Sequence, residues 1–286
     1  MKVIKVGILI SYDYEFVKTL LPIIYGHIEE IYFAVDIERL TWSGEKFEIK
    51  EEFWRWLKEF DVSNKIILYE DHFFVLGLKA IQCETRERTM LAEKMGPCDW
   101  YIQIDSDEYF IDFEAFVNKL RDFEPQGPTT VACKVATLFK KVNDGYLIVA
   151  ESNEMLNFAT NKPVYDSARN NESGNIILNW DDLVLHQSWA RSAEAIYLKL
   201  RNWGHKDDFP VDSFYNLWNA VDAYNAYALA DFHPLIGSTW RKLRFIKGSI
   251  NEIRESESLR QINISDDVQV KKKPLLSRLW KEIKGN

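Results

Sequence analysis

Residues 99–110 read Asp-Trp-Tyr-Ile-Gln-Ile-Asp-Ser-Asp-Glu-Tyr-Phe, an apolar run that ends in three carboxylates. Successive side chains of an extended segment point to opposite sides, so we expect Asp105 and Asp107 to point the same way at the end of a strand. Two carboxylates that converge there repel each other unless a cation lies between them. The pattern predicts a site for a hard cation such as Mn²⁺ or Mg²⁺. The alternative is a solvated turn whose acids cap a helix that begins near Asp112.

The segments before this stretch alternate between strand and helix patterns. Strands are expected at 3–10, 31–35, 65–69 and 101–104, and helices at 16–25, 51–60 and 84–95. Such alternation is typical of an α/β fold with a mostly parallel, Rossmann-like sheet that helices cover on both faces. Ligands of these sheets bind at the carboxyl ends of the strands, where Asp36 and the acidic stretch fall.

Beyond residue 130 the pattern changes to short β-rich pieces and then to helices. The β-rich pieces are 131–138, 146–149, 176–178 and 183–185, and the expected helices are 193–202, 212–229 and 240–257. We interpret residues 1–265 as one domain with a helical C-terminal part, divided at about residue 130, followed by a basic amphipathic tail at 266–286.

Composition excludes several classes of protein. The 286 residues are 47% hydrophobic and include 10 Trp, 13 Tyr and 17 Phe, which excludes a disordered chain. A net charge of −8 argues against a nucleic-acid partner. The sequence has three cysteines that lack the spacing of a metal site, and it shows neither a signal-peptide pattern nor an apolar run of about 18 residues. We therefore expect a cytoplasmic protein.

Four further features follow a fixed order along the chain. A helix carries Glu-Thr-Arg-Glu-Arg at 84–88, the Asp-Ser-Asp follows at 105–107, His-Gln-Ser-Trp-Ala-Arg-Ser occupies 186–192, and Lys199 precedes Trp-Gly-His at 203–205. This order, over about residues 1–240, resembles bacterial family 2-type glycosyltransferases of the GT-A fold with a DxD motif and a late metal-ligand histidine. The sequence departs from that family at 88–89, where Arg-Thr replaces the usual Arg-Asn.

The resemblance implies a role for each of these residues. It makes residues 1–130 the nucleotide-binding half and residues 131–265 the acceptor half. It implies that Asp107, His186 and Asp105 hold Mn²⁺ (or Mg²⁺). Asp105 reaches either the metal or the ribose. It also implies that the remaining candidates bind the nucleotide and its phosphates, namely Ser11, Tyr12, Asp36, Arg88, Arg191 and Lys199.

Each assignment has a simpler alternative in the residues themselves. His186 after an apolar run is also typical of a core or edge residue. Arg88 and Glu84 have the spacing of a helix-surface ion pair. Asp36 ends an expected strand, a position that is also typical of a turn residue. Lys199 could equally lie on a solvated helix face.

The proton acceptor is not identified by any pattern. An inverting transfer needs a carboxylate near the acceptor hydroxyl, whereas a retaining one does not. Asp181, Asp182 and Asp208 are the candidates, with Asp166 and Glu172 also in the acceptor half. Trp203, His205, His233 and Trp240 suit either an acceptor cleft or core packing.

The resemblance implies metal-dependent transfer of a sugar from a UDP- or GDP-linked donor to a glycan or lipid-linked acceptor, in bacterial cell-surface polysaccharide biosynthesis. One alternative is a sugar nucleotidyltransferase, although residues 8–14 (Ile-Leu-Ile-Ser-Tyr-Asp-Tyr) lack the glycine-rich phosphate loop of that class. The other alternative is an inactive GT-A relative that acts as a binding protein.

The basic tail could bring the protein to a membrane surface. Residues 275, 276, 279, 280 and 283 form an apolar stripe at helical spacing, and the opposite face is rich in lysine. This pattern predicts either a peripheral contact with anionic lipids at the inner membrane face or a terminal helix docked on the domain.

Overall fold

The computed structural model describes residues 2–172 and 174–262. The predicted amphipathic tail lies outside these residues. The first half alternates as expected, and its elements are β1 (Ile4–Ile10), η1 (Tyr14–Phe16), α1 (Val17–Ile24), η2 (Tyr25–His27), β2 (Glu30–Asp36), α2 (Glu51–Phe60), β3 (Ile66–Asp71), α3 (Ala80–Met95), β4 (Trp100–Asp105), β5 (Glu108–Phe110) and α4 (Phe113–Asp122).

The second half begins with long strands and ends with helices. Its elements are β6 (Thr129–Val142), β7 (Gly145–Ala150), β8 (Met155–Thr160), β9 (Ile176–His186), α5 (Ala193–Asn202), α6 (Val211–Ala220), η3 (Ala226–Ala228), β10 (Lys242–Lys247), α7 (Ile250–Glu255) and α8 (Glu257–Ile262).

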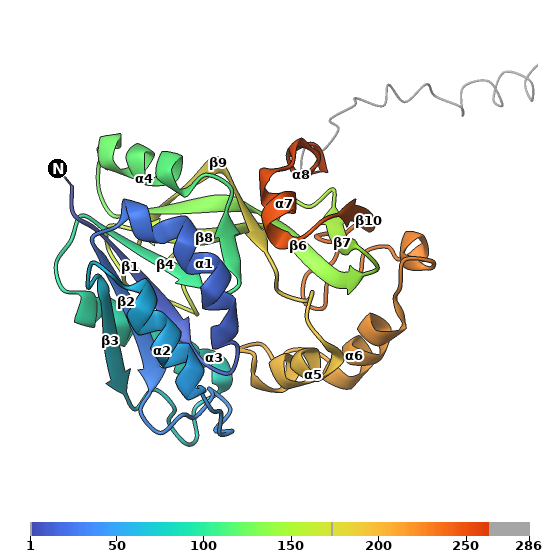
Figure 1. The fold of residues 1–286 in the computed structure, drawn as a ribbon, viewed down its shortest axis with the longest axis horizontal. Coiled ribbons are helices and arrows are strands. Elements are labelled where there is room, and N and C mark those ends of the chain that lie inside the picture. The colour runs from blue at the N-terminus through green and yellow to red at the C-terminus, as the bar shows by residue number, and fades with distance from the viewer. Residues whose placement is uncertain (1, 173, 263–286) are drawn as a thin grey trace, which may run out of the picture.

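One ten-stranded mixed sheet runs through both halves, with helices on its faces (Figure 1). Strands β3, β2, β1 and β4 are parallel neighbours, so their carboxyl ends meet at one edge. Beyond β4 the order continues through β8, β6, β7 and β10 in antiparallel pairs. The predicted α/β class with a mostly parallel sheet flanked by helices is confirmed, and the antiparallel pairs make that sheet mixed.

Close packing of α3 against β1 fixes the position of that helix. A Cβ added to Gly7 would lie 2.7 Å from Leu91 Cδ2, so any larger residue here would require the Leu91 side chain to shift. Because α3 lies antiparallel to β1 in the crossover, the N-terminal part of the helix, which carries Arg88, lies at the carboxyl edge of the sheet.

Strand β9 joins the acidic stretch to the second half of the protein. It runs parallel to β6 and its last residues pair with β5, so that Glu108 stands opposite His186. The two segments predicted at 176–178 and 183–185 are therefore one continuous strand. This pairing, which depends on contacts far apart in sequence, brings residue 186 beside the 105–108 turn.

Two predicted helices are wrong in extent. The helix expected at 212–229 ends at Ala220, where Lys140 Nζ caps the carbonyls of Trp218, Asn219 and Val221 at 2.8, 2.9 and 2.6 Å. The Asp222 carboxylate then accepts backbone N–H groups in a turn that cannot continue the helix.

The helix expected at 240–257 is instead the strand β10 followed by the short helix α7. Gly248, at φ = +118°, separates the two elements, and Ser249 begins α7 with a capping box to Glu252. The apolar residues of 242–247 pack as a strand against β7, and this tertiary pairing outweighs their helical spacing.

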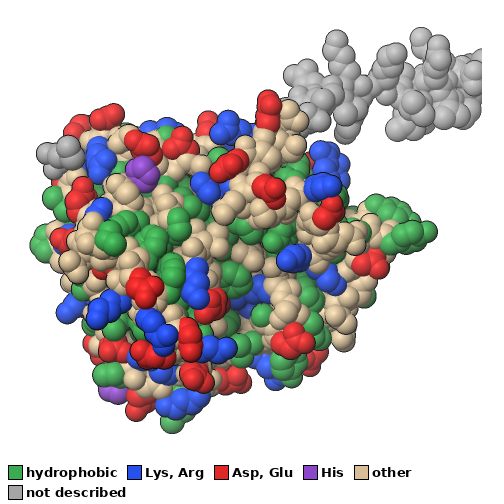
Figure 2. All heavy atoms as spheres, in the orientation of Figure 1, with side chains coloured by type: hydrophobic (Ala, Val, Ile, Leu, Met, Phe, Trp, Pro, Cys, Tyr) green, Lys and Arg blue, Asp and Glu red, His purple; other side chains and the backbone are tan. Residues whose placement is uncertain are grey.

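The surface carries acidic and basic side chains intermixed over the face shown in Figure 2. In the described part of the chain, the helices are too short or too polar to cross a lipid bilayer.

Candidate functional site

A cavity of about 240 Å³ opens at the edge of the sheet where β1, β2 and β4 end. Residues from both halves line it, because Thr137 of β6, His186 at the end of β9 and Lys199 of α5 contribute to the wall. The cavity wall includes every predicted nucleotide or metal residue, namely Ser11, Tyr12, Asp36, Arg88, Asp105, Asp107, His186, Arg191 and Lys199.

Asp107 is the centre of a charged cluster on this wall. It is 2% exposed, and its Oδ2 accepts a hydrogen bond from Arg191 Nη2 at 2.5 Å and lies 3.7 Å from Lys199 Nζ. Its Oδ1 lies 3.5 Å from His186 Nε2. Burial opposes ionisation, but Lys199, His186 and Arg191 outweigh it and hold the pKa of Asp107 well below its usual value. The carboxylate is therefore ionised, with cationic groups on two sides.

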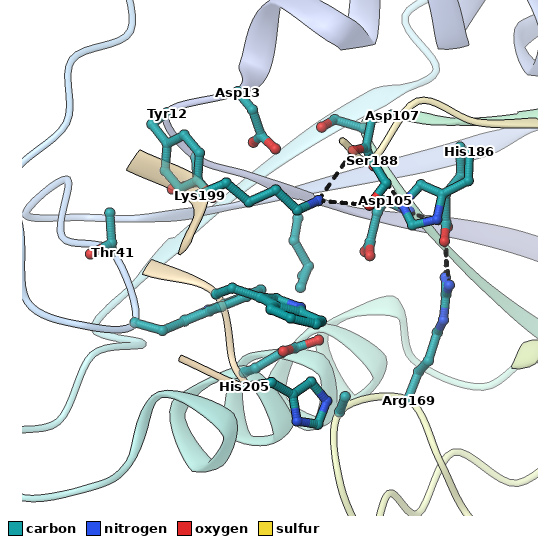
Figure 3. A pocket seen from close by; sticks show the side chains of 18 of the residues that line it. Tyr12, Asp13, Thr41, Asp105, Asp107, Arg169, His186, Ser188, Lys199 and His205 are labelled. Atoms are coloured by element: carbon teal, nitrogen blue, oxygen red, sulfur yellow. Dashed lines mark hydrogen bonds and ion pairs between the residues drawn. The ribbon is translucent and has the colours of Figure 1, made fainter. Parts of the chain in front are cut away.

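Helix α5 explains why Lys199 is buried. Ser192 caps its first turn by accepting the N–H of Ala195 at 3.2 Å, and Ile196, Lys199 and Leu200 share the face that packs inward. Lys199 is 8% exposed, and its ammonium points toward Asp107 and Ser188 (Figure 3). The solvated-face alternative for Lys199 is wrong.

Burial lowers the pKa of the Lys199 ammonium, and neighbouring Arg191 adds to this effect while Asp107 opposes it. The pKa of His186 is raised, because Asp107 outweighs the burial that would lower it. Arg191 is 8% exposed, lies over the Phe16 ring and also bonds Asp13 at 3.1 Å. Lys199, His186 and Arg191 form a compact cationic surface. The carboxylates of Asp107 and Asp13 balance part of its positive charge.

Asp105 takes part in a separate ion pair. Arg88 Nη2 donates to Asp105 Oδ1 at 2.8 Å and to Glu84 Oε1 at 2.9 Å. The i,i+4 pair with Glu84 is therefore present, yet Arg88 also reaches the cavity, so the two interpretations of Arg88 are compatible. Arg88 is 1% exposed.

Three buried arginine N–H positions at the cavity have no acceptor in the part of the chain that the structure describes. They are Arg88 Nη1, Arg191 Nε and Arg191 Nη1, whereas a fourth, Arg121 Nε, lies outside the cavity lining. Buried donors in native proteins are nearly always paired with protein, water or ligand. Both arginines line the cavity, so anionic oxygen atoms of a ligand are suitable acceptors.

The loops after β2 and β3 are held together by Asp36. Its two oxygens accept backbone N–H groups from Glu38, Leu40, Phe73 and Phe74 at 2.9–3.2 Å. These bonds support the turn-residue interpretation, in which Asp36 shapes the wall beside Tyr12 and Thr41 rather than using its carboxylate on a ligand.

The three candidates for a proton acceptor lie outside the cavity lining, so the geometry of the cavity does not support their assignment. Asp181 is 92% exposed in its side chain and pairs with Lys134 on the flank of β9. Asp182 pairs with Lys119, and Asp208 with His205. Residues 181 and 182 lie four or more positions before His186 on an extended strand, which places them about 13 Å or more from the strand end.

Sequence reasoning missed four charged residues of the wall: Asp13, Glu87, Glu154 and Arg169. Asp13 directly follows the first strand, a position that could have identified it. Arg169 binds Glu108 with both terminal nitrogens, but it lies in an irregular segment without any pattern. Trp203, His205, His233 and Trp240 line the cavity as well as packing on one another.

The donor atoms at Asp107 and His186 suit a divalent cation in part. A carboxylate oxygen and an imidazole nitrogen 3.5 Å apart are ligands that Mn²⁺ accepts, and the cavity gives a phosphate oxygen room to join them. Among the described residues no preformed group of three or more acidic, histidine or cysteine ligands occurs. Asp105 would have to turn from Arg88 to serve as a third ligand.

Glu87 gives the site a pH-dependent stability. The carboxyl is 5% exposed and accepts the Trp42 Nε1 proton at 2.5 Å, and burial raises its pKa to about 8. Since the unfolded chain loses this proton near the usual pKa of 4.5, the folded protein binds more protons between these values. The contribution of Glu87 to stability is therefore complete below pH 4.5 and is lost as the pH rises through about 8, at about 1.4 kcal/mol per pH unit.

We expect Glu87→Gln, whose amide oxygen still accepts from Trp42, to remove this part of the pH dependence. Denaturant unfolding at pH 5.5, 7.0 and 8.5 measures it, with exposed Glu93→Gln on the same helix as the control. Equal slopes of unfolding free energy against pH in wild type and Glu87→Gln would contradict the prediction.

Comparison with known proteins gives remote structural likenesses. No protein-family model and no curated protein sequence matches this chain. HddC from Yersinia pseudotuberculosis, complexed with GMP-PN, is 9% identical with a TM-score of 0.33 over 65% of this chain and 93% of its own. A proposed glucose-1-phosphate thymidylyltransferase from Bacillus anthracis, in complex with sucrose, is 13% identical with a TM-score of 0.36 over 72% and 96%.

A mannose-1-phosphate geranyltransferase from Thermus thermophilus is 10% identical with a TM-score of 0.29 over 86% of this chain and 75% of its own. TM-scores this low do not identify a function. The family 2-type resemblance therefore remains a prediction, which the geometry of the site must support.

Proposed function

We propose that this protein transfers a sugar from a nucleoside-diphosphate sugar to an acceptor hydroxyl, with the diphosphate bound against Arg88, Arg191 and Lys199. The observation that carries the proposal is the set of buried, unpaired N–H groups on Arg88 and Arg191 at a cavity at the carboxyl edge of a parallel sheet. An anion that brings several oxygens satisfies them together, as a diphosphate does.

The chemistry follows from where charge develops. When the bond between the anomeric carbon and the phosphate oxygen breaks, the leaving diphosphate gains negative charge. Arg191 and Lys199 are fixed beside it in a site of low exposure, so they stabilise the leaving group without having to reorganise. Asp107 keeps both cations in place through the 2.5 Å bond to Arg191 and the 3.7 Å approach to Lys199.

Asp107 and His186, with Asp105 as the third ligand, are the residues that would hold Mn²⁺ or Mg²⁺. A bound cation would supply further neutralisation of the diphosphate. The nucleoside then extends toward Ser11, Tyr12 and Trp42, which line the adjoining wall.

The second candidate is a sugar nucleotidyltransferase. The descriptions of the remote structural neighbours fit this class better than a glycosyltransferase. It would join a sugar phosphate to a nucleoside triphosphate and release pyrophosphate. Against it, the β1–α1 connection reads Ser-Tyr-Asp-Tyr at 11–14, leads into the 3₁₀ helix η1 and has no glycine cradle for a triphosphate.

One assay separates the two reactions by their products. The protein is incubated with Mn²⁺ and UDP- or GDP-sugars plus a panel of methyl glycosides, and separately with nucleoside triphosphates plus sugar 1-phosphates. Release of nucleoside diphosphate with formation of a glycoside is expected. Release of pyrophosphate in the second mixture would overturn the proposal in favour of the nucleotidyltransferase, and no product in either mixture would favour a binding protein.

A further inference from the structure

The segment between β7 and β8 holds a carboxylate rigidly at the cavity. Glu154 Oε2 accepts hydrogen bonds from Thr137 Oγ1 at 2.9 Å and from Trp240 Nε1 at 3.1 Å. The backbone carbonyl of Glu154 accepts from Val135 N at 3.0 Å. Both side-chain bonds go to one oxygen, and Oε1 has no hydrogen bond within residues 2–172 and 174–262. One oxygen of a fixed carboxylate is thus available to a ligand.

Strand register places this carboxylate beside the cluster at Asp107. Thr137 stands directly opposite His186 in the β6–β9 pair, and neighbouring strands are about 4.8 Å apart. The hydroxyl of Thr137 binds Glu154, and the imidazole of His186 lies 3.5 Å from Asp107. Glu154 therefore lies one strand away from the group that faces the proposed diphosphate.

Trp240, which bonds Glu154, belongs to a group of aromatic side chains on the cavity wall. His233 packs edge-on against Trp240 at a ring distance of 4.4 Å, and Trp203 against His205 at 5.0 Å. All four line the cavity, and His205 is drawn with Asp107 in Figure 3. Indole and imidazole rings combine apolar faces with polar edges, which suits the C–H faces and hydroxyls of a sugar ring.

His233 adds a hydrogen-bond donor to this wall. Its Nδ1 accepts the backbone N–H groups of Leu235 and Ile236 at 3.1 and 2.9 Å, so a neutral ring carries its proton on Nε2. Burial lowers the pKa of His233, with Glu154 opposing and His205 adding to this effect. The ring is therefore neutral and offers one N–H donor beside one carboxylate acceptor.

From this geometry, and resting on the proposed function, we infer that Glu154 is the proton acceptor of the reaction and that the aromatic wall binds a sugar ring of the acceptor. The acceptor oxygen forms a bond to the anomeric carbon, and the bond from that carbon to the diphosphate oxygen breaks with its electron pair. The hydroxyl proton passes to Glu154 Oε1, and the diphosphate leaves toward Arg191 and Lys199.

The other acids do not meet these requirements. Asp181, Asp182 and Asp208 lie outside the cavity lining, and Asp13 is engaged by Arg191 at 3.1 Å. Glu154 combines a free oxygen, two donors that fix its orientation and a place in the cavity wall one strand away from His186.

The test is Glu154→Gln, which keeps the acceptor for Thr137 and Trp240 but cannot take a proton. Calorimetry is expected to give UDP or GDP affinity within about twofold of wild type, whereas kcat for transfer to a methyl glycoside falls by about 10²–10⁴-fold. The acidic limb of the pH profile of kcat/KM is expected to disappear, which loss of packing alone would not cause. Asp181→Asn, which changes an exposed acid outside the cavity lining, is the control with unchanged transfer.

Transfer by Glu154→Gln at more than a tenth of the wild-type rate, with the acidic limb intact, would overturn the inference. Should Glu154→Gln fail to fold in thermal denaturation, Glu154→Asp replaces it, and wild-type kcat in that shortened variant would equally overturn it. These outcomes differ from failure of the proposed function, in which the wild type itself neither binds UDP or GDP nor transfers a sugar.

Discussion

Arg169→Met is expected to lower the free energy of unfolding by about 3–5 kcal/mol, because it leaves Glu108 charged and unpaired in the interior. Glu108 is 0% exposed and receives both terminal nitrogens of Arg169, at 2.7 Å for the Nη1–Oε2 bond. Its Oε2 also accepts the backbone N–H of Asp105 at 2.8 Å. The ion pair therefore braces the turn that presents the charged cluster.

Denaturant unfolding measures this change, with Lys134→Met as the matched control. Lys134 pairs with Asp181 at 2.8 Å on the same sheet, but these side chains are 47% and 92% exposed. Loss of such an exposed pair costs at most about 1 kcal/mol. The double variant Glu108→Gln, Arg169→Met should regain part of the loss, since no unpaired charge remains. An effect of Arg169→Met no larger than that of the control would show that the buried pair is unimportant.

Asp107→Asn is expected to reduce transfer by about 10³-fold while the protein stays folded. The amide keeps the shape but loses the charge that orients Arg191 and Lys199 and the oxygen donor beside His186. Removal of a preorganised electrostatic contact to a developing charge typically costs about 10²–10³-fold, and loss of a metal ligand adds to this. Initial rates with Mn²⁺ and the donor sugar are the measurement.

Binding in the absence of metal separates the two roles of Asp107. With a chelator present, UDP or GDP should bind to Asp107→Asn at least as well as to wild type, because one negative charge is gone from the phosphate site. With Mn²⁺ present, the wild type should bind the nucleotide more tightly than Asp107→Asn does. Asp181→Asn, an exposed acid on the same sheet, should behave like wild type. Wild-type transfer rates in Asp107→Asn would refute the assignment.

The sequence predicted the parts of this protein that depend on local pattern. Alternating strands and helices up to residue 105 gave the parallel half of the sheet, and strand-end positions gave Asp105 and Asp107. The family resemblance grouped His186, Arg191 and Lys199 at one site, and all three line the same cavity. Whether these residues bind a metal or a nucleotide stays a prediction.

What the sequence did not predict depends on contacts between distant segments. Residues 240–247 have helical spacing, yet pairing with β7 makes most of them a strand. Glu154 and Arg169 lie in segments of irregular structure, and only the arrangement of β6, β8 and β9 brings them to the cavity. The acids nearest to His186 in sequence, Asp181 and Asp182, project from the strand far from its end, so proximity in sequence does not bring them to the cavity.

Calorimetric titration of the wild type and Arg191→Ala with UDP and with GDP, in the presence of Mn²⁺, tests the central claim most directly. We expect one of the two nucleotides to bind to the wild type in a 1:1 ratio. Arg191→Ala should weaken that binding by about 30-fold, as the loss of about 2 kcal/mol from charge-assisted hydrogen bonds predicts. Failure of both nucleotides to bind the folded wild type, or equal affinity for Arg191→Ala, would contradict a diphosphate site at this cavity.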